Sequence, residues 1–141
     1  MNISTHILPG FSPDQMKAIN DAVALLQRVC EQEDFIQVVS GMGQPLLVQN
    51  YVYGPMTLTL KPWRPWNPFT SATASTPMNQ GPIGLGPKAF KQDTAALANT
   101  IAHEYTHVLG FGHPLYYTPE RIHTVPYAVG ELVESIARRL G

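Results

Sequence analysis

Three of the five histidines in this 141-residue chain fall within eleven residues, in the segment HEYTHVLGFGH at positions 103–113. Helical residues four apart face the same side about 6 Å apart, so His103 and His107 can present both imidazoles to one metal ion. Gly110 constrains the path of the chain beyond them, because a left-handed residue there ends the helix and can return His113 toward the other two. The segment therefore predicts a helix whose C-terminal end carries a metal site.

The residue types in this segment indicate zinc and a catalytic use of it. Catalytic zinc is held by three protein ligands, commonly imidazole nitrogens, and keeps one position for water. Glu104 lies about 100° around the helix from His103. There it can stay off the metal and receive the proton of a zinc-bound water. A purely structural zinc site has no need of a carboxylate at that place.

The segment resembles the signature H-E-x-x-H-x-x-G-x-x-H of the metzincin zinc metallopeptidases and matches all five fixed positions. The resemblance implies one catalytic Zn²⁺ held by His103, His107 and His113, with Glu104 as general base and acid in peptide-bond hydrolysis. It also implies an α+β fold: a small twisted mixed sheet with a backing helix and an active-site helix, then a short C-terminal lobe ending in a helix. In that family a peptide or protein substrate lies extended and pairs antiparallel with the edge strand of the sheet.

Metzincins place a methionine-containing turn beneath the zinc, but all five methionines of this chain precede His113. The nearest counterpart is HTVPY at 123–127, in which Val125 takes the methionine position. The resemblance to the astacin-like branch implies that Tyr127 faces the zinc, binding it at rest or stabilising the oxyanion during hydrolysis. A tyrosine that simply packs after a proline turn fits the same residues equally well.

Other interpretations stay open on the residues alone. In gluzincin-type peptidases the third ligand is a glutamate on a later helix, and Glu131 on the last predicted helix can take that place. His123 is a weaker candidate ligand, with a turn-stabilising role as its simpler explanation. A different class of protein would be a non-catalytic module that binds peptides along its sheet edge and keeps zinc for stability.

Three helices are predicted from capping residues and apolar periodicity. The segment SPDQ at 12–15 has the residues of a capping box with proline at the first helical position, and apolar residues spaced three and four apart continue that helix to about Glu33. The active-site helix begins at Asp93 or Thr94 and reaches about Leu109. The third helix spans about 128–140.

Strands are predicted at 3–11, 35–39, 46–53 and 56–61, the last two joined as a hairpin at Gly54-Pro55. The stretch 62–87 contains six prolines, with Trp63, Trp66 and Phe69 between them. It is typical of a long loop with one short strand near 83–85. Its aromatic residues either patch the core or stack on a ligand. Long loops in compact domains often carry function, so this one is expected to help set substrate specificity.

Length and composition fit one globular domain over residues 1–141. The resemblance to the metzincins implies that this domain divides into an upper lobe at about 1–110 and a lower lobe at about 111–141. Hydrophobic residues make up 44% of the chain, which is enough for a core, whereas charged residues make up only 13% and the net charge is −1. A nucleic-acid-binding protein should instead carry a basic face.

The single cysteine and the N-terminal residues bear on the compartment. Cys30 cannot form an intrachain disulfide and is expected to be a small buried thiol. No apolar run approaches the roughly 20 residues needed to cross a bilayer. Because the first residues also lack a secretory signal pattern, the expected location is the cytoplasm, with no membrane partner.

Overall fold

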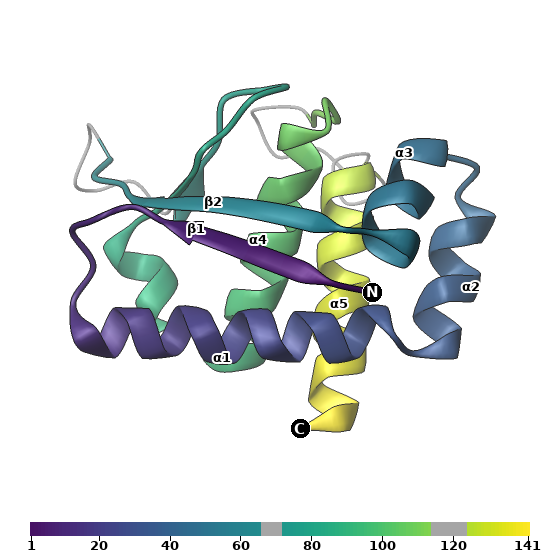
Figure 1. Cartoon of the computed structure of the whole chain (residues 1–141), viewed down its shortest axis with the longest axis horizontal. Helices are drawn as coiled ribbons and strands as arrows, with labels where there is room; N and C mark the ends of the chain where they lie inside the picture. Colours follow the sequence, from purple (N-terminus) through teal and green to yellow (C-terminus); the bar gives the residue numbers. More distant parts are fainter. Residues whose placement is uncertain (66–71, 114–123) are drawn as a thin grey trace.

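A computed structural model of the chain describes residues 1–65, 72–113 and 124–141. Helices pack against a four-stranded mixed sheet that is not closed, which confirms the predicted α+β class (Figure 1). In chain order the elements are β1 (Ile3–Ile7), α1 (Pro13–Cys30), α2 (Glu33–Gly41), α3 (Pro45–Leu47), the π-helical segment η1 (Val48–Tyr53), β2 (Met56–Pro62), β3 (Ala74–Ser75), β4 (Ile83–Leu85), the short 3-10 helix η2 (Pro87–Lys91), α4 (Thr94–Val108) and α5 (Val125–Leu140).

The sheet has the strand order β1-β2-β4-β3. β1 and β4 both pair with β2 in parallel, and β3 pairs with β4 antiparallel. Along β2, Met56, Leu58 and Leu60 are fully buried and alternate with less buried residues, as expected for a strand with one face on the core. The two-residue strand β3 forms the edge of the sheet next to α4, with which it is in contact.

Helix α1 begins as predicted. The Ser12 hydroxyl accepts a hydrogen bond from the Gln15 N–H at 3.1 Å, and the Gln15 side chain accepts one from the Ser12 N–H at 2.9 Å. Its buried stripe packs against α4 and α5 (Figure 1). Its last residue, Cys30, is buried as expected, and burial raises the pKa of the thiol to about 12, so the thiolate is scarce at neutral pH. None of the described helices has the length and apolar character of a membrane span.

Two predicted strands are wrong, because residues 35–39 and 46–53 are helical. The fully buried residues in these segments are Phe35 and Val39 in one, and Leu47 and Tyr51 in the other. Each pair is four residues apart, the spacing of a helical face, whereas a strand would bury every second residue. Short runs rich in β-branched and aromatic residues do not distinguish the two structures when tertiary packing favours the helix.

The predicted hairpin at Gly54-Pro55 is wrong for the same reason. β2 instead pairs in parallel with β1, from Ile3 opposite Met56 to Ile7 opposite Leu60. Gly54, with φ of 72°, ends the helical segment and leads directly into this pairing. The short strand near 83–85 is confirmed as β4.

The proline-rich stretch 62–87 contributes to both the core and a pocket beside α4. Trp63 lies over Gly84 and Gly86, so close that a β-carbon at Gly84 would come within 2.8 Å of the Trp63 Cβ. Trp63 therefore patches the sheet, in line with one of its two predicted roles, whereas Trp66 and Phe69 lie outside the described residues. Residues of the later part of the stretch, namely Ala72 to Thr76 and Met78, line the pocket.

Candidate metal centre

Helix α4 carries three of the predicted site residues. Its N-cap is Asp93, whose carboxylate accepts a hydrogen bond from the Ala96 N–H at 2.9 Å. In the middle of the helix the buried Tyr51 hydroxyl donates to the Ala102 carbonyl at 2.7 Å. This bond ties η1 to the residue before His103. The segment 46–53, which was wrongly predicted as a strand, therefore helps to hold the part of α4 that carries the site.

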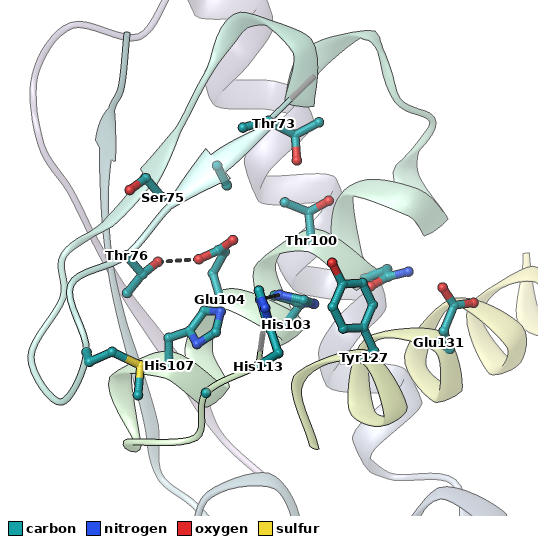
Figure 2. Close-up of a pocket in the computed structure, with 15 residues that line it drawn as sticks. Thr73, Ser75, Thr76, Thr100, His103, Glu104, His107, His113, Tyr127 and Glu131 are labelled. Carbon is teal, nitrogen blue, oxygen red and sulfur yellow. Dashed lines mark hydrogen bonds between the residues drawn. The ribbon is translucent and has the colours of Figure 1, made fainter. Parts of the chain in front are cut away.

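The chain turns back at Gly110, as predicted. Gly110 has φ of 100°, and the next N–H, that of Phe111, donates to the Thr106 carbonyl at 3.0 Å. A β-carbon at Gly110 would lie 2.4 Å from the Asn79 Oδ1. The positive φ therefore favours glycine, and any larger residue would also have to displace the Asn79 side chain. The turn brings His113 back beside the helix (Figure 2).

Replacing Gly110 with alanine is expected to lower the free energy of unfolding by about 1–2 kcal/mol, because alanine is strained at positive φ and would displace Asn79. Gly41→Ala is the matched control: that glycine ends α2, a β-carbon there would meet nothing within 4 Å, and its backbone needs no positive φ. Urea unfolding with a chelator present measures both variants. Equal midpoints for the two would contradict this role of Gly110.

The imidazole rings of His103, His107 and His113 lie close to one another. The ring centroids are 5.2 Å apart for His103 and His107, 5.1 Å for His103 and His113, and 4.9 Å for His107 and His113. One ring nitrogen of each residue lies within 4.8 Å of those of the other two. The Nε2 atoms of His103 and His113, which are ten positions apart in the sequence, lie 3.2 Å from each other. This group can hold a metal ion.

The spacing of one donor pair fits a small tetrahedral cation. Two nitrogens at 2.0–2.1 Å from a zinc ion in tetrahedral geometry are about 3.3 Å apart, close to the Nε2–Nε2 distance of His103 and His113. The His107 Nδ1 lies 2.7 Å from the Phe111 carbonyl oxygen. Because a carbonyl only accepts, Nδ1 must carry the proton, which leaves the Nε2 lone pair of His107 for a metal.

Glu104 lies beside this group with only 8% of its surface exposed. The Thr76 hydroxyl donates to Glu104 Oε2 at 2.6 Å, drawn as a dashed line in Figure 2. Burial raises the pKa of the Glu104 carboxyl above its ordinary value, and the bond from Thr76 and the charge of His113 oppose this shift. Thr76 was not predicted as a site residue and belonged only to the proline-rich stretch, because a threonine outside any motif carries no functional signal of its own.

Tyr127 joins the site from α5. Its ring lies 4.6 Å from that of His103 and 5.0 Å from that of His113, measured between centroids. The predicted turn around Val125 is instead the first turn of α5, which begins three residues earlier than expected because Pro126 fits an early helical position. Gly130 lets α5 approach α4, since a β-carbon there would lie 3.3 Å from the His103 Cβ.

These residues line a pocket of about 660 Å³. Its walls are the β3 edge and the residues around it, the end of α4, and the first turns of α5 (Figure 2). Glu131 also lines it, but beyond Tyr127 and outside the group of ligand nitrogens. That arrangement favours His113 over Glu131 as third ligand. His123 lies outside the described residues, and His6 lies on β1, away from the pocket.

No protein-family model, curated protein or solved structure matches this chain. The features that bear on function are those of the site itself: three imidazoles that can hold a metal, a buried carboxylate next to them, and the end strand β3 of the sheet along the same pocket.

Proposed function

We propose that this protein is a zinc-dependent metalloendopeptidase of the metzincin type. The observation that carries the proposal is Glu104, a nearly buried carboxylate fixed by Thr76 at the side of three histidines that can hold a metal. A site that only stores or is stabilised by a metal has no use for a carboxylate held in this way. A hydrolase needs one beside the attacking water.

His103, His107 and His113 would hold the zinc ion. When bound, zinc supplies Lewis-acid chemistry, lowering the pKa of a water molecule and polarising the scissile carbonyl. Glu104 accepts the proton of the attacking water and later delivers it to the leaving amine, so it acts first as base and then as acid. The Thr76 hydroxyl keeps the carboxylate in place through both transfers. The Tyr127 phenol, beside the His103 and His113 rings, stabilises the oxyanion.

The edge strand β3 gives the substrate its backbone partner. In the antiparallel register with β4, the Gly86 N–H donates to the Thr73 carbonyl at 2.7 Å. The next residue, Ala74, then turns its own N–H and carbonyl away from β4. Ala74 lines the pocket, so an extended peptide can add to the sheet there. Backbone pairing accepts many sequences, as expected for a peptidase acting on unfolded chains.

The proposal is tested with the full chain, stripped of metal, reloaded with one equivalent of Zn²⁺ and incubated with an unfolded protein substrate. We expect cleavage at internal peptide bonds, its loss in the presence of a chelator, and its return when zinc is added back. A protein that binds one zinc tightly and cleaves neither unfolded proteins nor short peptides would overturn the proposal and favour a zinc-stabilised peptide-binding module.

A further inference from the structure

Glu131 is a carboxylate that the proposed mechanism does not use. It lies in the second turn of α5, exposed to the pocket that it lines. Within the described part of the chain it makes no hydrogen bond or ion pair. Glu134, less than one turn further, is different: it contacts Arg138 at 2.7 Å and accepts a hydrogen bond from Asn99 at 2.9 Å. The Glu131 charge is thus left available to a ligand.

In the part of the chain that the structure describes, the pocket lining has no lysine or arginine that could pair with Glu131. Among the described residues that line the pocket, Glu104 and Glu131 are the acidic ones. Glu104 is committed to Thr76 and to the proton transfers of the proposed reaction. Because Glu131 stands outside the histidine group that would hold the zinc ion, its own negative charge favours a ligand with a positively charged group next to it and disfavours one with a carboxylate there.

The direction of β3 decides which part of a substrate meets Glu131. Figure 2 shows Thr76 beside Glu104, whereas Thr73 lies above Thr100, farther from Glu104 and nearer to Glu131 than Thr76 is. β3 therefore runs from the Glu131 side toward the Glu104 side. A peptide that pairs antiparallel with β3 runs in the opposite direction, from the Glu104 side to the Glu131 side. The part of the peptide that follows the scissile bond therefore extends toward Glu131. Glu131 lies one helical turn beyond Tyr127, about 6 Å along the helix axis. A long substrate side chain, one or two residues after the scissile bond, can therefore reach it.

We infer that Glu131 makes the site select a lysine or arginine side chain on the C-terminal side of the bond that is cut. This inference rests on the proposed peptidase function and adds a substrate class to it. Because Glu131 is exposed, a charge-assisted contact with it gives a preference of about 2- to 5-fold over a neutral side chain of similar length. An acidic side chain at the same place is rejected.

The test uses peptides that differ only at the first or second residue after the cut, with lysine, glutamine or glutamate there. The wild-type protein should show a kcat/KM about 2- to 5-fold higher for lysine than for glutamine. Glu131→Gln should lose this discrimination, and Glu131→Lys should reverse it in favour of glutamate. Glu134→Gln, the same change on a carboxylate outside the pocket lining, should keep the wild-type order.

Binding of the same peptides to the Glu104→Gln variant, followed by fluorescence anisotropy, separates this inference from the proposed function. Tighter binding of the lysine peptide that depends on Glu131 supports the inference even if no peptide is cut. Cleavage without a lysine preference, a preference unchanged in Glu131→Gln, or a preference for lysine before the cut would overturn it while leaving the peptidase function in place.

Discussion

Glu104→Gln is expected to lower kcat/KM by a factor between about 100 and 10,000 while the protein still binds one zinc ion. Glutamine has the shape of glutamate and can still accept the hydrogen bond from Thr76, so the side chain stays in place. It cannot accept and return a proton, which is the step assigned to Glu104. Initial rates at equal zinc content, measured by metal analysis of the same samples, check this prediction.

Thr76 provides graded controls for the same prediction. Thr76→Val removes the donor and keeps the shape, so the carboxylate is retained but less well placed, and kcat/KM should fall about 10-fold. Thr76→Ser restores a hydroxyl and should recover most of the rate. If Glu104→Gln cleaves as fast as the wild type, Glu104 is not the base. If it keeps a biological effect without cleavage, the protein acts by binding.

His113→Ala is expected to weaken zinc binding by roughly 100-fold or more. Small zinc domains bind zinc through three or four ligands with a binding free energy of about 10–16 kcal/mol. Each ligand therefore contributes about 2.5 kcal/mol or more to that free energy. His113 supplies the Nε2 that lies 3.2 Å from that of His103. Competition with a chromophoric chelator gives the dissociation constants of the variant and the wild type.

Two other variants make this measurement decisive for the third ligand. His6→Ala removes an exposed histidine of β1 and should leave the zinc affinity unchanged. Glu131→Ala should also bind zinc as the wild type does, because Glu131 stands outside the group of ligand nitrogens. The opposite result, in which Glu131→Ala loses zinc and His113→Ala keeps it, would identify a gluzincin-like site.

The candidate metal site was the most predictable part of this chain, because its geometry depends on local rules. The spacing of His103 and His107 follows from the helical repeat, and Gly110 adopts the left-handed conformation that the return of His113 requires. Capping residues predicted the starts of α1 and α4 for the same reason. The division of the chain into two lobes stays a prediction.

What could not be predicted depends on contacts between distant segments. Tyr51 is helical because its ring and hydroxyl are buried against α4, fifty-one residues away, and nothing within residues 46–53 carries that information. Thr76 meets Glu104 only because β3 pairs with β4 and lies over α4. Glu131 was singled out as an alternative ligand, but the approach of α5 to α4 at Gly130 places it beyond Tyr127 instead.

The strand order also has a consequence for how fast the molecule assembles. β1 and β2 are parallel neighbours separated by four helical segments, so their pairing closes a loop of about fifty residues. Non-local pairing of this kind is slow, because the entropy of loop closure is lost before the contacts form. The β3–β4 pair is local by comparison. We expect folding to be limited by the side of the sheet farthest from the pocket. Substitutions in the candidate metal site should therefore change the unfolding rate far more than the refolding rate.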